Sequence, residues 1–306
     1  MNEIKIFAPG TIANLSCGFD VLGLCLDNVG DEMIIRKSAQ KGVRITKIVG
    51  ADLPLETDKN VAGVAALAML ENLESSFGFE IEIYKKIKAG SGIGSSAASS
   101  AGAVFGINEL LGRPFSNKEL VPFAMQGEKL ASGSAHADNV APALLGGFTL
   151  VRSYEPLDIV KIKSPSDLFA TVIHPQIELK TSDARSILKQ TISLQSAIIQ
   201  WGNVGGLIAG LYTNDYELIG RSLHDEIVEP LRSILIPGFE LVKKAALEKG
   251  ALGVGISGSG PSIFALSKGK ETADKVAQAM CEVYNEIDLP YEIHVSKIND
   301  EGIKII

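Results

Sequence analysis

The sequence has little of what a disulfide-stabilised or membrane-spanning protein needs. Its 306 residues hold only three cysteines, Cys17, Cys25 and Cys281. This odd, scattered set argues against a disulfide framework and fits a reducing compartment. The longest apolar runs, around 61–70 and 140–151, fall short of the roughly 18 residues that a membrane span requires. The N-terminus lacks the apolar core of a signal peptide. We therefore expect a soluble cytoplasmic protein.

Positive charge is also scarce, with 29 Lys and Arg against 36 Asp and Glu and a net charge of -7. A protein that binds nucleic acid or anionic membranes through a broad surface needs a basic face. We therefore expect neither partner, although a local site can still hold a small anion. The four histidines show no metal-ligand spacing with each other or with the cysteines.

Strand and helix patterns mix without steady βαβ alternation, which predicts an α+β fold, and the chain length favours two domains. The expected strands cover 3–9, 32–38, 41–50, 79–87, 146–154, 168–175, 291–298 and a pair around a glycine turn within 252–267. The expected helices cover 60–78 with Gly78 as its stop, 96–112, 116–132 with a Ser116–Glu119 capping box, several segments of 181–235, 237–250 and 271–287. The mixed stretch 153–166 is where we expect the domain boundary.

The stretch "KAGSGIGSSAASSAG", residues 88–102, lies directly between a predicted strand and a predicted helix. A flexible linker is the ordinary interpretation of such composition, but no spare residues separate the two elements. The free N–H groups of the helix's first turn then point into the loop and form an anion site. Glycine lets the backbone approach a phosphate and adopt positive φ, and Ser95 and Ser96 can donate to phosphate or bind a cation.

The spacing of this loop matches neither of two common nucleotide motifs. No lysine follows the last glycine, as a Walker A loop requires. The order G-x-G-x-G departs from the dinucleotide-binding fingerprint, which disfavours an oxidoreductase. We therefore predict a phosphate-binding loop of another type.

Two further segments accompany the loop. In "APGTIANLSCGFDVLGLCLD", Asn14 and Asp20 read by themselves as turn residues that satisfy their own backbone. The segment "GVGISGSGP", residues 253–261, reads as a tight hairpin. It would also present a backbone wall to a ligand.

Together the three segments resemble the GHMP kinase superfamily, in order and over most of the chain. The matching stretches run from Pro9 to Gly23, from Gly90 to Ala98 and from Gly258 to Pro261. Within the superfamily, "ANLSCGFDVLG" is most similar to the homoserine kinases. The sequence departs from the family at Lys88, where proline is usual, and at Ile93, where leucine is commoner.

The resemblance implies a two-domain fold. Residues 1–164 would form a nucleotide-binding domain similar to ribosomal protein S5 domain 2, and residues 165–306 a ferredoxin-like domain. It also implies that ATP lies in the phosphate loop, with Mg²⁺ held by Ser96 and Glu128, two catalytic residues. Without the resemblance, Glu128 reads as an exposed helix acid. The implied ATP-binding residues are Lys88, Ala89, Gly90, Ser91, Gly92, Ile93, Gly94, Ser95, Ser96, Ala97 and Ala98.

The implied acceptor is the side-chain hydroxyl of L-homoserine, a zwitterion. Asp20 would take its ammonium group, and two arginines would bind its carboxylate. The implied substrate-binding residues are Asn14, Asp20, His136, Asn139, Arg185, Arg232 and Gly258. Each arginine reads equally well as a solvated helix residue, and His136 as a structural histidine. Asp138 is a candidate general base or a buried structural acid, and a loose transition state also permits transfer without a base.

Two other functions stay open at this stage: another GHMP small-molecule kinase, of the mevalonate-pathway or shikimate type, and a non-catalytic metabolite sensor on the same fold. The resemblance also implies a homodimer.

Overall fold

The structure is a computed structural model that describes residues 1–73, 77–179 and 181–306. Its first sheet follows the order β11-β1-β2-β4-β3, with β5 paired to β2 and β6 paired to β5. The β3–β4 pair is parallel, and the other pairs are antiparallel. The strands are β1 (Glu3–Ala13), β2 (Leu22–Ser38), β3 (Val43–Val49), β4 (Gly78–Tyr84), β5 (Phe148–Tyr154), β6 (Leu157–Ile162) and β11 (Lys304–Ile305).

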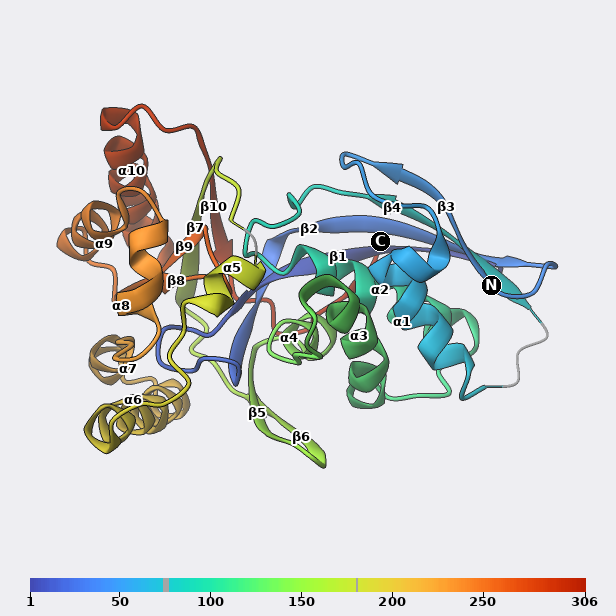
Figure 1. Ribbon diagram of the computed structural model, residues 1–306, viewed down its shortest axis with the longest axis horizontal. Coiled ribbons are helices and arrows are strands. Elements are labelled where there is room, and N and C mark those ends of the chain that lie inside the picture. Colours follow the sequence, from blue (N-terminus) through green and yellow to red (C-terminus); the bar gives the residue numbers. More distant parts are fainter. Residues whose placement is uncertain (74–76, 180) are drawn as a thin grey trace.

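Four helices cover one face of this sheet, and α2 packs on β1 and β2 (Figure 1). Helix α2 is rich in small buried residues, so it can lie close to the strands. The capping box at Ser116 forms as expected, and α3 continues through Pro122. The helical segments are η1 (Thr57–Lys59), α1 (Val61–Leu70), α2 (Ser95–Leu110), α3 (Asn117–Ser132) and α4 (Val140–Leu145).

The second sheet has the order β10-β7-β9-β8, and all its pairs are antiparallel. Chain order β7–helices–β8–β9–α10–β10 with this strand order is the ferredoxin-like pattern. The strands are β7 (Leu168–Pro175), β8 (Gly253–Ile256), β9 (Ile263–Lys268) and β10 (Tyr291–Lys297). The helices are α5 (Thr181–Ser186), α6 (Leu194–Thr213), α7 (Tyr216–Ser222), α8 (Glu229–Arg232), η2 (Ser233–Leu235), α9 (Phe239–Glu248) and α10 (Lys270–Glu286).

The expected α+β class is confirmed, with one core cluster that joins both halves and a second under α9 and α10. The division into residues 1–164 and 165–306 stays a proposal. Strand β11, near the C-terminal end of the chain, pairs with β1 and so belongs to the first sheet. None of the described helices is both long enough and apolar enough to cross a membrane.

Several expected element boundaries were wrong. Gly78 does not stop a helix: α1 ends at Leu70, part of the expected helix (74–76) lies outside the described residues, and Gly78 begins β4. A Cβ at Gly78 would lie 1.8 Å from the Gln40 carbonyl oxygen, so glycine permits a close backbone approach there. Strand β2 begins ten residues earlier than expected, and the mixed stretch contains β6.

Candidate active site

A cavity of about 500 Å³ opens where α2, the 14–20 turn and α5 meet. Both halves of the chain supply its walls. The expected site residues that line it are Asn14, Asp20, Ala89, Gly90, Gly92, Gly94, Ser95, Ser96, Glu128, His136, Asp138, Asn139, Arg185, Arg232 and Gly258. Five expected nucleotide-binding residues do not line it: Lys88, Ser91, Ile93, Ala97 and Ala98. The Lys88 ammonium instead contacts the Gln176 side chain at 2.8 Å.

The glycine loop turns the chain from β4 into α2. Gly90, Gly92 and Gly94 adopt φ of 74°, 82° and 65°, a region that favours glycine. The Ala98 N–H donates to the Gly94 carbonyl at 2.9 Å. The N–H groups of residues 95–97 therefore precede the first hydrogen bond of the helix ladder. This arrangement suits a bound anion.

A buried ion pair that sequence reasoning missed braces this loop. The Lys85 ammonium, 2% exposed, pairs with Asp31 and donates to the Ser95 carbonyl at 2.9 Å and to the Ser99 hydroxyl at 3.1 Å. All three of its N–H groups are thus used. Burial lowers the pKa of Lys85, and the charge of Asp31 opposes that shift. In the sequence Lys85 is one of two adjacent lysines, and only its burial distinguishes it.

The turn after β8 braces the loop from the other side. The Ser257 hydroxyl donates to the Gly92 carbonyl at 2.7 Å. A Cβ at Gly92 would lie 2.5 Å from the Ser257 carbonyl oxygen, whereas one at Gly90 would meet nothing within 4 Å. The absence of a side chain at Gly92 therefore allows the two halves of the chain to come into contact. Gly90, in contrast, lies beside open space.

The two loop serines have different partners. The Ser95 hydroxyl donates to the Ile87 carbonyl at 3.0 Å, which uses it inside the protein. Ser96 and Glu128 line the same cavity, and the Ser96 side chain acts to lower the pKa of the Glu128 carboxyl group. Glu128 is buried rather than exposed, and its Oε1 atom has no partner. Burial raises the pKa of Glu128 to about 7, while Ser96 and the Lys85 charge oppose the shift.

Ser96 and Glu128 together suit a cation that needs few protein ligands. Within the described ranges, no group of three or more His, Cys, Asp and Glu could hold a metal ion. A hydroxyl plus one carboxylate with an unpartnered oxygen suits a hard ion that takes its other ligands from phosphate and water.

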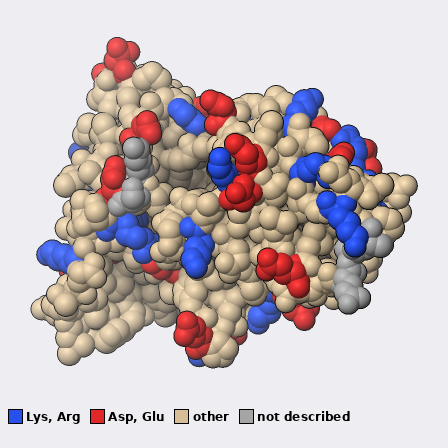
Figure 2. Space-filling view, turned by 45° about the vertical axis from the view of Figure 1, so that its right-hand side comes forward, with Lys and Arg blue, Asp and Glu red and all other residues tan. Residues whose placement is uncertain are grey.

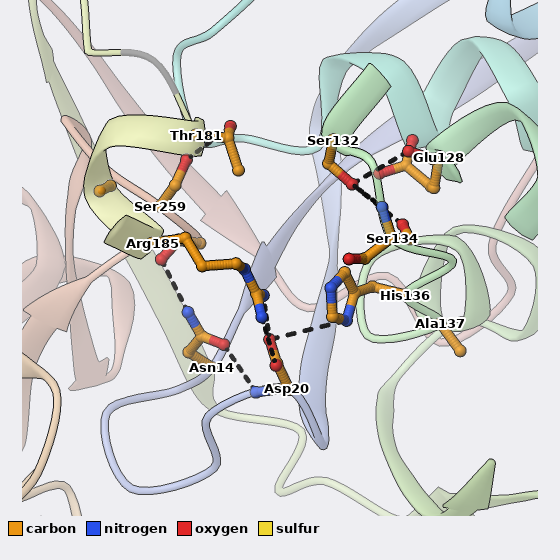
Figure 3. A network of polar contacts seen from close by, with 12 residues as sticks. Asn14, Asp20, Glu128, Ser132, Ser134, His136, Ala137, Thr181, Arg185 and Ser259 are labelled. Carbon is orange, nitrogen blue, oxygen red and sulfur yellow. Dashed lines mark hydrogen bonds and ion pairs between the residues drawn. The ribbon is translucent and has the colours of Figure 1, made fainter. Parts of the chain in front are cut away.

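The opposite end of the cavity holds paired charges (Figure 3). The Arg185 guanidinium donates to both oxygens of Asp20, at 3.1 Å and 2.8 Å. His136 Nδ1 lies 3.7 Å from Asp20 Oδ1, and His136 Nε2 is buried without a partner. Burial lowers the pKa of His136, against the opposing effect of Asp20.

Arg232 lies beside this ion pair on α8. It donates to the Ala184 carbonyl at 2.9 Å and to the Gly258 carbonyl at 3.1 Å. Its guanidinium and that of Arg185 both lie over the Phe19 ring, at 5.1 Å and 5.4 Å from the centroid. Burial, followed by the charge of Arg185, lowers the pKa of Arg232 to about 10. Two cations held this close favour an anionic partner.

The amides of Asn14 and Asn139 are used within the protein. Asn14 Oδ1 accepts the Asp20 N–H at 3.0 Å, and its Nδ2 donates to the Gly258 carbonyl at 2.7 Å. Asn139 Oδ1 accepts the Thr11 hydroxyl at 2.8 Å. Asn14 thus stabilises the 14–20 turn, in which Asn14 and Asp20 adopt φ of 73° and 59°.

Asp138 is buried, lines the cavity, and is acted on by the charges of both Asp20 and Glu128. Burial, reinforced by the charges of Asp20 and Glu128, raises its pKa to about 7. Tyr154, another residue that sequence reasoning missed, receives the Ala137 N–H at 3.3 Å and donates to the Asp20 carbonyl at 2.9 Å. Tyr154 therefore connects the segment that contains Asp138 to the 14–20 turn.

Comparison with known proteins gives consistent matches over the chain. Residues 60–147 match the family "GHMP kinases N terminal domain", and residues 207–286 match "GHMP kinases C terminal". The chain is 50% identical over 320 residues to a homoserine kinase of Chlorobium phaeobacteroides, covering 100% of both. It is 57% identical to the crystal structure of homoserine kinase from Cytophaga hutchinsonii, with a TM-score of 0.97 and 100% and 98% coverage. A mevalonate kinase of L. major, 16% identical with a TM-score of 0.71 and 96% coverage of each chain, shares the fold. The expected two-domain GHMP kinase fold is thus confirmed.

Proposed function

The chain belongs to the GHMP kinase family, in the group of the homoserine kinases, and we propose that it transfers the γ-phosphoryl group of ATP to the side-chain hydroxyl of L-homoserine, a step of threonine biosynthesis. One observation carries the proposal. The glycine loop at the start of α2 and the Asp20–Arg185 pair line the same cavity. An anion site and a zwitterion site in one cavity suit phosphoryl transfer to an amino acid.

The nucleotide would lie along α2 with its phosphates on the glycine loop. The amides of residues 95–97 and the helix dipole would hold the phosphate oxygens. Leu53, Val61 of α1 and Leu130 of α3 add apolar surface to the cavity. Helices α1 and α3 lie apart from α5 (Figure 1). This surface would receive the purine base, which has apolar faces.

Mg²⁺ is the cation that Ser96 and Glu128 would hold. The unpartnered Oε1 of Glu128 is the observation that supports this assignment. When bound, Mg²⁺ would neutralise charge that develops on the phosphates. The chain's own part is to present the hydroxyl and the carboxylate and to hold α2 in place through Lys85.

When the substrate binds, the hydrogen bonds between Asp20 and Arg185 would be replaced by bonds from each residue to the substrate. Its ammonium group would bind Asp20, and its carboxylate would bind Arg185 and Arg232. Because these groups line one cavity, both ends of the zwitterion are recognised together. His136, Asn139 and Gly258 would complete the wall around it.

Asp138 is our candidate for the group that accepts the hydroxyl proton. A carboxyl with a pKa of about 7 can take a proton near neutral pH. The loose transition state asks little of such a base, so its contribution would be smaller than that of Glu128.

The test is ADP release with ATP, Mg²⁺ and a panel of acceptors. We expect turnover with L-homoserine and little with mevalonate, galactose or 4-hydroxybutyrate, which has the carboxylate and hydroxyl but no ammonium. Equal rates with 4-hydroxybutyrate would contradict the role of Asp20. No release with any acceptor would contradict the enzyme assignment and favour a sensor.

We also propose the cytoplasm as its compartment and a second copy of the chain as a partner.

A further inference from the structure

A buried amide lies on the inner face of α6. No residue of this helix is charged, and Figure 2 shows the lower left of the molecule, where Figure 1 places α6, without blue or red side chains. Three of its four buried residues are Leu207, Gly210 and Leu211, and the fourth is Gln200. A buried amide is costly unless its polar atoms are hydrogen-bonded. The partners of Gln200 therefore indicate why an amide stands at this position.

Gln200 joins two segments that are far apart in the sequence. Its Nε2 group donates to the Cys17 carbonyl at 2.8 Å and to the Asp225 carboxylate at 2.9 Å. Its Oε1 atom accepts the Glu226 N–H at 2.9 Å. Both N–H groups of the amide and its oxygen are thus used. One side chain therefore connects the 14–20 turn to the segment that precedes α8.

Asp225 in turn holds the start of α8. Its Oδ1 atom accepts the N–H groups of Ile227 and Val228 at 2.9 Å and 3.0 Å, and its Oδ2 atom accepts the Glu229 N–H at 2.8 Å. The first N–H groups of a helix have no partner within the helix, so this carboxylate determines where α8 begins. Arg232 is the last residue of α8. The position of its backbone therefore depends on Asp225.

The turn at the other end of this connection has a strained backbone. Asn14, Leu15 and Ser16 adopt φ of 73°, 46° and 60°, a region that is costly for residues other than glycine. Such a conformation persists only where neighbouring groups hold it in place. The hydrogen bond from Gln200 to the carbonyl of Cys17, the next residue, is one of the contacts that do so.

The turn and α8 are not packed tightly against each other along their whole length. A cavity of about 10 Å³ is lined by residues of both, among them Ser16 of the turn and Glu229 of α8. Among the described residues, neither the Ser16 hydroxyl nor the Glu229 Oε2 atom has a hydrogen-bond partner. The spacing between the turn and α8 therefore depends on the hydrogen bonds that pass through Gln200 and through the Gly258 carbonyl.

We propose that Gln200 and Asp225 are positioning residues of the acceptor site and that they set the distance of Arg232 from Asp20. The ammonium end of the site has supports of its own, because two other side chains hydrogen-bond the backbone of Asp20. The carboxylate end depends on the placement of α8. The inference rests on the proposed function, since an amino-acid substrate requires an arginine at a fixed distance from an aspartate.

Steady-state kinetics of Gln200→Met tests this role. Methionine is unbranched and of similar length but has no amide, so we expect the KM for L-homoserine to rise about tenfold, the cost of about one hydrogen bond to a charged group, while the KM for ATP changes less than about twofold. The matched control is Asn203→Leu. Asn203 lies on the same helix, and its side chain donates to the His224 carbonyl at 3.0 Å rather than to the 14–20 turn. This control should keep the wild-type KM for L-homoserine.

A double substitution separates positioning from a general loss of stability. In an Arg232→Leu background, Gln200→Met should change the KM for L-homoserine by less than about twofold, because the group that it positions is gone. Effects that multiply, an equal rise in the KM for ATP, or an unchanged KM for L-homoserine would overturn the proposal. Asp225→Asn serves where Gln200→Met does not fold. It retains the shape of the side chain but places an NH₂ group against a backbone N–H, so the same selective rise in KM is expected.

A crystal structure distinguishes failure of this inference from failure of the proposed function. In Gln200→Met or Asp225→Asn, we expect the Arg232 guanidinium to move by about 1 Å relative to Asp20, a shift large enough to impair an active site. An unmoved guanidinium would overturn the positioning role even if the wild-type chain phosphorylates L-homoserine. A wild-type chain that releases no ADP would contradict the proposed function, and the displacement of Arg232 would then decide the positioning role.

Discussion

The two ends of the cavity are built in different ways. The proposed phosphate end consists mainly of backbone groups from one continuous segment, residues 85–99, at the junction of β4 and α2. The proposed acceptor end consists of side chains from separate elements: Asp20 from the 14–20 turn, Arg185 from α5 and Arg232 from α8.

This difference indicates which substitutions should disturb each end of the cavity. A backbone site depends on the chain path, which glycines and the buried Lys85–Asp31 pair maintain. A side-chain site depends on contacts that hold the two halves of the chain together. The Gly258 carbonyl provides such a contact, because it accepts hydrogen bonds from Asn14 and Arg232. Substitutions at the first end should therefore affect phosphoryl transfer or folding, and substitutions at the second should affect acceptor affinity.

Glu128→Gln should have the largest effect. It retains the shape of Glu128 but removes the carboxylate beside Ser96, so we expect kcat to fall at least about 100-fold. The thermal stability should not fall, because a neutral amide replaces an acid that is costly to bury. Steady-state ADP release and a melting curve check both statements, and Glu119→Gln on the exposed start of α3 is the control. Normal kcat would remove the cation assignment.

The loop glycines should separate folding from binding. Gly92→Ala places a Cβ against the Ser257 carbonyl at positive φ, so we expect a loss of several kcal/mol of stability. Gly90→Ala should cost about 1 kcal/mol, because alanine is strained at its positive φ. It should also weaken ATP binding, because its methyl group enters open space near the phosphates. Calorimetric titration with ATP and thermal denaturation distinguish the two. Equal stability of both variants would show that Gly92 does not hold the halves together.

Arg185→Leu should act on the acceptor end alone. We expect the KM for L-homoserine to rise about 10- to 100-fold, the cost of one charged hydrogen-bonded pair, with the KM for ATP nearly unchanged. Arg232→Leu should raise the same KM and also lower stability, because the Ala184 and Gly258 carbonyls lose their donors. If the KM for ATP rose equally, the two ends of the cavity would not be separate.

The contrast between the two ends also explains what the sequence could predict. The phosphate loop is contiguous, so the spacing of its glycines and its place between a strand and a helix were visible. The roles of Lys85 and Tyr154 were not, because burial against Asp31 and contact with the Asp20 carbonyl arise only in the folded chain. The acceptor residues were reached only through family resemblance, since no local spacing relates Asp20 to Arg185. Likewise, Ser95 and Asn14 became internal donors once their neighbours were placed.

Asp138→Asn should have the smallest effect on turnover, and it should change how the stability of the fold depends on pH. Burial raises the pKa of Asp138 from 3.8 to about 7. A raised carboxyl pKa stabilises the fold at low pH, and this contribution is lost as the pH rises between those two values. The variant does not ionise, so we expect it to be more stable than wild type by on the order of 4 kcal/mol at pH 8 and nearly equal at pH 4. Urea denaturation at both pH values checks this. A difference of the same size at pH 4 would contradict the assigned pKa shift.

The central claim is that main-chain amides at the β4–α2 junction hold the terminal phosphates of ATP. A crystal structure with a nonhydrolysable ATP analogue, Mg²⁺ and L-homoserine tests it most directly. We predict phosphate oxygens within about 2.7–3.2 Å of amide nitrogens between residues 90 and 97, the hydrogen-bond range, with the amino acid between Asp20 and Arg185. A nucleotide bound elsewhere, with those amides paired to protein atoms, would contradict the account.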